Sequence, residues 1–209
     1  MINFKNYKFM SLGSNCADLW YLGSNRLHGP ADNIVIKTAT GVNYLLNNTL
    51  FNKIYSDGFT EEIKTWANND DIKNILNYED FKIVHNNPET DKFKLEFKKR
   101  SDRLLNFIAD ISAENKWLVF NLNDYFATKD HKPTLELLKL IKILKDKKLY
   151  DKTIFVQLKR TKATTENKWE SWIDSDYLFK KTIIINDVIE LGAAQKQFKE
   201  QFINILKGN

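Results

Sequence analysis

The residues best suited to chemistry lie near the N-terminus, in the run Ser11-Leu12-Gly13-Ser14-Asn15-Cys16. The apolar residues at 7–12 predict a short strand, and residues 17–22 predict a helix directly after this run. A turn between a strand and a helix presents free backbone N–H groups, which bind anions and lower the pKa of a nearby thiol. We therefore expect Cys16 to act as a nucleophile. Three residues of the turn would shape it and form an oxyanion or ligand site: Gly13, Ser14 and Asn15.

The same turn also has a purely structural interpretation. Cys16 is then a small buried apolar residue at the start of a helix, which Ser14 and Asn15 cap. The first arginine after Cys16 is Arg26, too far along the chain for the phosphate loop of a tyrosine phosphatase. The sequence also lacks a glycine-rich run ending in Lys-Ser or Lys-Thr, and it lacks the dinucleotide-binding glycine fingerprint. These absences exclude the common nucleotide-binding loops.

A general base for Cys16 would come from one of three histidines. His85 follows the apolar residues 81–84, which predict a strand, so it would share an edge of the sheet with Cys16 if the two strands are parallel. His28 and His131 lie in less favourable places, and we expect His85 to be the base. A surface or capping role is the alternative for each histidine.

Polar residues follow a further predicted strand at residues 117–122. Asn123 and Asp124 would lie at the same edge of the sheet, where Asp124 would orient the histidine as the third member of a triad. An Asn-Asp pair is also ordinary turn chemistry. Asp32 and Asn33 are additional candidates for ligand binding near the first turn.

The elements that would position these residues alternate between strands and helices. Three runs are apolar on both faces, as central parallel strands require: residues 117–122, 153–158 and 182–185. Shorter strands are predicted at 33–36 and 81–84. Helical periodicity or capping marks five further segments: residues 104–111, 134–144 and 198–205, a helix opening near residue 60, and a short one over 71–76. This order predicts a single three-layer α/β domain over residues 1–209, with a mostly parallel sheet of about five to six strands flanked by helices.

One long segment, residues 159–180, lacks regular periodicity. A segment of this length within a compact domain is often a lid or a binding loop. The alternative, which we favour, is a short amphipathic helix over residues 166–173 that packs Trp169 and Trp172 on the sheet.

Composition and charge restrict the class of protein. The chain has 209 residues, of which 43% are hydrophobic and 28% charged, the balance of an ordinary globular protein. A single cysteine excludes an intramolecular disulfide, and the net charge of +5 is too dispersed to indicate nucleic-acid binding. No apolar run approaches the ~18 residues of a membrane span and no signal peptide is apparent, so we expect a cytoplasmic protein. We expect no metal or cofactor and a small-molecule, peptide or glycan substrate; the oligomeric state is left open.

The run at residues 11–16 resembles the opening of a bacterial family of papain-like cysteine peptidases, whose members carry Ser-Leu-Gly-X-Asn-Cys after a short strand. The order of elements is similar over about residues 7–160. Three later features are similar. The family has an Arg-Gly-Pro-like segment, which Leu27-His28-Gly29-Pro30 matches, and a histidine after a strand, which His85 matches. An arginine-containing helix comes next, which Arg100 and Arg103 match loosely. The chain departs from the family at 32–35, where Asp-Asn-Ile-Val stands instead of Pro-Phe-Asp-Trp, and at Asn86, where an aspartate is common.

The resemblance implies a cysteine hydrolase or acyl transferase, with Cys16 as nucleophile and His85 as base. One alternative is a non-catalytic protein that binds a glycan or nucleotide sugar and assists surface-polysaccharide synthesis. A third is an SGNH-type esterase that uses Ser14, with Asn123 and Asp124 resembling a later block of that class. The Asp-X-X-His block of such esterases is missing, because no histidine follows His131.

Overall fold

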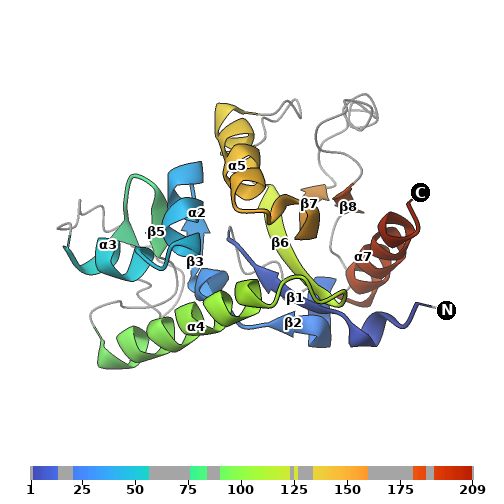
Figure 1. Ribbon diagram of the computed structural model, residues 1–209, viewed down its shortest axis with the longest axis horizontal. Helices are drawn as coiled ribbons and strands as arrows, with labels where there is room; N and C mark the ends of the chain where they lie inside the picture. Colours follow the sequence, from blue (N-terminus) through green and yellow to red (C-terminus); the bar gives the residue numbers. More distant parts are fainter. Residues whose placement is uncertain are drawn as a thin grey trace, which may run out of the picture.

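The structure is a computed structural model that describes residues 2–13, 21–56, 76–83, 90–122, 125–126, 134–159, 181–186 and 191–208. Across these residues, five parallel strands form the main sheet in the order β2-β1-β6-β7-β8 (Figure 1). Their bounds are β1 Lys8–Ser11, β2 Arg26–Leu27, β6 Lys116–Leu122, β7 Thr153–Lys159 and β8 Thr182–Asn186. Helices surround this sheet, so the predicted α/β class with a mostly parallel sheet is confirmed.

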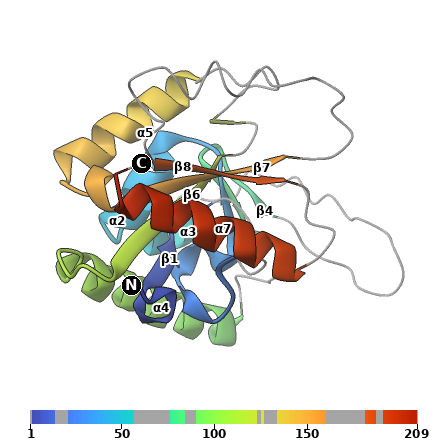
Figure 2. The same ribbon diagram turned by 90° about the vertical axis from the view of Figure 1, so that its right-hand side faces the viewer.

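Side chains alternate between the two faces of the main sheet, and each face has its own core. Phe9 and Val119 belong to the face covered by α7 (Leu191–Leu206), whose Phe198 and Phe202 are fully buried there. Figure 2 shows α7 lying across this face. Leu118 and its neighbours on the other face pack against four helices: α2 (Ala39–Leu46), α3 (Leu50–Ser56), α4 (Asp91–Ala109) and α5 (Leu135–Asp146). Helices therefore cover both faces, as strands that are apolar on both sides require.

A second, three-stranded sheet corrects the expectation for the strands at 33–36 and 81–84. β3 (Ile34–Ile36), β5 (Phe81–Ile83) and β4 (Leu76–Asn77) form an antiparallel sheet in the order β3-β5-β4, separate from the main one. A four-residue 3-10 helix, η3 (Pro30–Asn33), links β2 to β3. Parallel neighbours need a crossover of about a dozen residues or more, and this link is too short to provide one. The sequence predicts a short helix over residues 71–76. Its last residue, Leu76, lies instead in strand β4.

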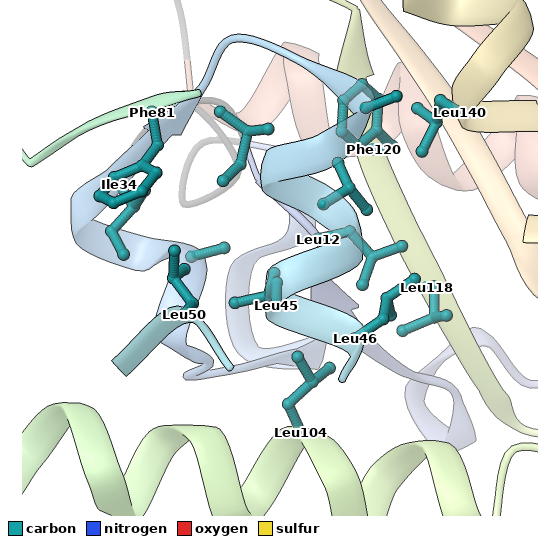
Figure 3. Packing of buried hydrophobic residues seen from close by; sticks show 14 of the residues in the cluster. Leu12, Ile34, Leu45, Leu46, Leu50, Phe81, Leu104, Leu118, Phe120 and Leu140 are labelled. Carbon is teal, nitrogen blue, oxygen red and sulfur yellow. The ribbon is translucent and has the colours of Figure 1, made fainter. Parts of the chain in front are cut away.

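The two sheets meet through α2 and through the end of β1. Leu45 and Leu46 of α2 pack between Ile34 of the second sheet and Leu118 of the main sheet (Figure 3). At the end of β1, Gly13 has a φ of +139°, and an added Cβ would stand 2.5 Å from Cγ1 of Ile36. Glycine is needed here, because a side chain would face both an unfavourable backbone conformation and a collision with β3.

Glu136, in the first turn of α5, caps the start of α2. Its carboxylate accepts hydrogen bonds from the backbone N–H of Ala39 at 2.7 Å and from Lys139 Nζ at 2.8 Å. Burial acts to raise the pKa of Glu136, but these hydrogen bonds and the Lys139 charge outweigh it, and the pKa lies below its usual value. The ionised carboxylate is thus part of the packing between α2 and α5.

Candidate functional site

The candidate site lies at the edge of the main sheet where β1, β2 and β6 end. The parallel register pairs Met10 with Leu27 and Ser11 with Val119, so the three strands leave the sheet at the same side. After β2, an added Cβ on Gly29 would stand 3.7 Å from the Ser11 carbonyl oxygen. The segment that follows β2 therefore lies directly against the end of β1, where the run towards Cys16 begins.

The structure describes only some of the predicted site residues. Gly13 and Asp32 lie at this edge, and Asn33 ends η3 beside them. Other predicted residues lie outside the described part of the chain: Ser14, Asn15, Cys16, His85, Asn123, Asp124, His131, Trp169 and Trp172. The pairing of Cys16 with His85, and the orienting role of Asp124, stay predictions. The strand before His85 belongs to the second sheet, so the parallel arrangement on which that pairing was based is not the one found.

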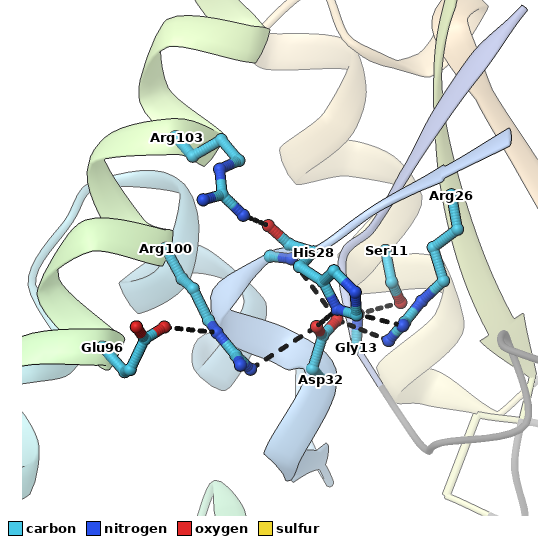
Figure 4. Close-up of polar contacts among 9 residues, drawn as sticks. Ser11, Gly13, Arg26, His28, Asp32, Glu96, Arg100 and Arg103 are labelled. Carbon is cyan, nitrogen blue, oxygen red and sulfur yellow. Dashed lines mark hydrogen bonds and ion pairs between the residues drawn. The ribbon is translucent and has the colours of Figure 1, made fainter. Parts of the chain in front are cut away.

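Asp32 is the centre of a polar cluster at this edge (Figure 4). Its side chain is 6% exposed, and Oδ1 lies 2.6 Å from Nη2 of Arg26, whose side chain is 4% exposed. Oδ2 lies 2.8 Å from His28 Nδ1 and 3.5 Å from Nη1 of Arg100 on α4. The backbone N–H of Gly29 donates to Oδ1 at 3.4 Å, since Asp32 occupies the capping position of η3. A short local helix thus holds a buried carboxylate among three basic groups.

His28 is held in one orientation by its neighbours. Its Nδ1 is closer to Asp32 Oδ2 (2.8 Å) than to Arg26 Nη1 (3.3 Å), so we assign the Nδ1 proton to a hydrogen bond donated to Asp32. Arg103 Nη1 donates to the His28 carbonyl oxygen at 2.8 Å. The His28 side chain is 61% exposed. In the tautomer with its proton on Nδ1, Nε2 is the nitrogen that can accept a proton. A buried carboxylate on Nδ1 of an accessible imidazole is the arrangement that prepares a histidine to act as a general base.

The cluster takes in three of the four arginines of the chain. Arg26 comes from β2, whereas Arg100 and Arg103 lie one turn apart on α4. Arg100 is 22% exposed and also pairs with Glu96, Nε to Oε2 at 3.4 Å. The buried Nε of Arg26 has no hydrogen-bond partner among the described residues. In the part of the chain that the structure describes, the cluster contains three guanidinium groups and two carboxylates, Asp32 and Glu96, so positive charge is in excess there.

A second buried contact joins Tyr21, the first described residue after Cys16, to Asn121 of β6. The hydroxyl of Tyr21 donates to Asn121 Oδ1 at 2.5 Å, and both side chains are buried. Tyr21 and Leu22 are helical, as predicted for the end of the segment 17–22, and Tyr21 stacks on Phe198 of α7. Asn121 therefore takes part in the packing between β6 and the segment that begins at Tyr21.

Sequence reasoning did not place His28 or Arg26 in a polar cluster. The signal for the first was present, because His28 and Asp32 are four residues apart on either side of Gly29-Pro30, which starts a tight turn. The contribution of Arg26, Arg100 and Arg103 depends on how β2 and α4 pack, and no local pattern indicates it.

Comparisons of the chain with protein-family models, with curated proteins and with solved structures find no match. Within the described ranges, no three His, Cys, Asp or Glu residues are grouped so that they could hold a metal ion. In the same part of the chain, no helix is both long and apolar enough to cross a membrane.

Proposed function

We propose that the protein is a cysteine-dependent hydrolase or acyl transferase with Cys16 as its nucleophile. The observation that carries this proposal is the buried Asp32 that holds His28 through Nδ1, at the edge where β1 leads into the Cys16 segment. A cysteine nucleophile needs a base whose orientation is fixed by a third group, and this pair supplies both. A cytoplasmic location, where thiols stay reduced, suits such an enzyme.

In this proposal the Cys16 thiol attacks the carbonyl carbon of an ester, thioester or amide. The imidazole takes the thiol proton and later gives it to the leaving group, and the negative charge of Asp32 stabilises the imidazolium. Backbone N–H groups of the turn at residues 15–17 would hold the developing oxyanion. Water, or another acceptor in a transferase, then releases the acyl group from the sulfur.

His28 is the base that the described contacts favour, and His85 is the alternative. The last residue of β5, Ile83, pairs with Ile34, which directly follows η3. β5 therefore ends beside the short helix that carries Asp32. Its last residue, Ile83, is two positions before His85 in the sequence. Both histidines have support, and an experiment on the thiol separates them.

The test is the pH dependence of Cys16 alkylation by iodoacetamide, followed by mass spectrometry. Cys16 is the only cysteine, so the labelled site is unambiguous. The native protein is compared with His28→Gln and His85→Gln, and His131→Gln serves as the matched control. We expect an apparent thiol pKa well below ~8.5, which rises towards that value in His28→Gln and is unchanged in the control.

Each other result has a defined meaning. A rise only in His85→Gln assigns the base to His85 and keeps the function. A thiol with an ordinary pKa that responds to none of the three substitutions refutes the hydrolase, and favours the non-catalytic binding protein.

A further inference from the structure

We propose that Arg26, Arg100 and Arg103, together with His28, form a binding site for an oxyanion of the substrate, a carboxylate or a phosphate. The anion site stands on the described contacts alone. Its assignment to a substrate rests on the proposed function, and makes the enzyme one that acts on acidic molecules.

The choice of arginine at these positions is the first argument. The chain has 32 basic residues, of which only four are arginines: Arg26, Arg100, Arg103 and Arg160. Three of these meet at one edge of the main sheet, whereas lysine is used almost everywhere else. On a solvated surface, lysine supplies a positive charge as well as arginine does. The planar guanidinium group of arginine, however, binds carboxylates and phosphates through two parallel hydrogen bonds. The concentration of arginine here indicates recognition of a planar or tetrahedral oxyanion.

The second argument is that the internal partners do not use all the donors of the cluster. Arg26 and Asp32 form a buried pair at 2.6 Å, so the charge of Arg26 has a partner within the cluster. Arg100 lies 3.5 Å from the same carboxylate. Among the described residues, the only hydrogen-bond acceptor of the Arg103 guanidinium group is the His28 carbonyl oxygen, which carries no formal charge. Within the described residues, Nη2 of Arg100 and Nη2 of Arg103 donate to no acceptor, and the Arg103 side chain is exposed. Two guanidinium groups one helical turn apart thus retain N–H donors for an external acceptor.

The third argument is the unpaired Nε of Arg26. Its side chain is 96% removed from solvent, yet this N–H has no hydrogen-bond partner in the part of the chain described. A buried donor without an acceptor costs free energy, which an incoming oxygen atom recovers. The donor belongs to the same cluster as Arg100 and Arg103, beside Ser11 and Gly13 at the end of β1 (Figure 4). An anion held here lies near Gly13, the last described residue before Cys16.

The test is a titration of the folded full chain with inorganic phosphate and, separately, with acetate, at constant ionic strength. The readout is the NMR signal of the His28 ring, which is one of three histidine signals and is assigned by its loss in His28→Gln. Arg100→Gln and Arg103→Gln each remove one guanidinium group from the partly exposed side of the cluster. Lys99→Gln removes the same charge from an exposed position of α4, and is the matched control.

We expect a saturable shift of the His28 signal, with a dissociation constant that rises about ten-fold in Arg100→Gln and in Arg103→Gln and less than two-fold in Lys99→Gln. Tighter binding of phosphate than of acetate indicates a phosphorylated substrate, and the reverse order indicates a carboxylate. The absence of a saturable shift overturns the proposal. Equal weakening in all three variants also overturns it, because only general charge attraction is then present.

Cys16 alkylation on the same samples separates this proposal from the proposed function. An activated thiol without anion binding refutes the anion site and leaves the hydrolase intact. Anion binding with an ordinary, histidine-independent thiol supports the anion site and refutes the hydrolase, so the edge is then a binding site without catalysis.

Discussion

Replacing Asp32 with asparagine removes the charge at the centre of the cluster with little change in shape. Asparagine still accepts a hydrogen bond from the Gly29 N–H, which in the native protein donates to Oδ1 at 3.4 Å. It no longer neutralises Arg26, which lies 2.6 Å from the carboxylate, and no longer stabilises a protonated His28. The variant isolates the electrostatic role of Asp32 from its role in the turn.

The magnitude of the effect follows from burial. The side chains of Arg26 and Asp32 are 4% and 6% exposed, so solvent cannot replace the lost partner. Removing one member of such a buried pair costs about 3–5 kcal/mol, because the remaining charge stays desolvated. With a total stability of about 5–15 kcal/mol, the variant is expected to fold but to be strongly destabilised. For an m-value of about 2–3 kcal/mol/M, the urea midpoint falls by about 1–2.5 M.

The assay is urea unfolding at pH 7, followed by far-UV circular dichroism and tryptophan fluorescence. The double variant Arg26→Met/Asp32→Asn completes a thermodynamic cycle and is expected to be more stable than Asp32→Asn alone, because no unpaired charge is then buried. Arg100→Gln is the comparison, since Arg100 is 22% exposed and 3.5 Å from Asp32, and its loss costs less than about 1 kcal/mol. A cost for Asp32→Asn of less than about 1 kcal/mol, or the absence of coupling with Arg26, would refute the reasoning.

Three further substitutions test the elements around the site. Gly13→Ala destabilises by about 2–3 kcal/mol in thermal unfolding, since φ is +139° and the new Cβ meets Ile36 at 2.5 Å; part of this loss is recovered in an Ile36→Ala background. Tyr21→Phe costs about 1–1.5 kcal/mol in urea unfolding, because the 2.5 Å hydrogen bond to Asn121 is lost. Glu136→Gln costs about 1 kcal/mol at pH 7. Because the folded-state pKa of Glu136 lies below the usual 4.5, this contribution is present above that pH and disappears as the pH falls through the folded value.

Specific results would contradict each of these expectations. An equal loss for Gly13→Ala with and without the Ile36 side chain would show that the collision plays no part. A neutral Tyr21→Phe variant would show that the hydroxyl is equally well solvated in the unfolded chain. A stability difference for Glu136→Gln that is as large at pH 3 as at pH 7 would assign the effect to packing and not to the charge.

Much of the main sheet follows from sequence pattern alone. Residues 117–122 and 153–158 are apolar on both faces, and they form β6 and β7, which lie next to each other in the sheet. Thr134 caps α5 as its position before an apolar periodic segment suggests, accepting from the Leu137 N–H at 3.3 Å. These elements are long enough for their periodicity to identify both their type and their environment.

The short strands were not predictable in the same way. β2 has two residues, Arg26–Leu27, and carries no alternation that distinguishes it from a loop. β3 and β5 have three residues each, and such segments look the same in a parallel or an antiparallel sheet. Two short connections decide the direction of these strands: the four residues of η3 and the tight turn between β4 and β5. Packing against α2 also contributes. For this reason the strand at 81–84 was wrongly expected to be a parallel strand of the main sheet, and the position of His85 itself stays a prediction.

The polar cluster combines local and distant information. The spacing of His28 and Asp32 is readable in the sequence, whereas the approach of Arg100 depends on a contact between residues 68 positions apart. Nothing in the charge pattern of α4 marks Arg100 and Arg103 as different from the lysines beside them. Only the fold shows that these two side chains reach across to the segment after β2.

The position of α7 has a consequence for the synthesis of the chain on the ribosome. Phe198 and Phe202 of this last helix pack on Phe9 of the first strand and on Trp117 of β6. The other face of the sheet draws its buried residues from positions 10–155, so it has all its partners earlier in translation. The residues of this face that contact Phe198 and Phe202 therefore lack these partners until α7 has left the exit tunnel. During that interval the exposed aromatic surface is the part of the molecule that a chaperone would shield.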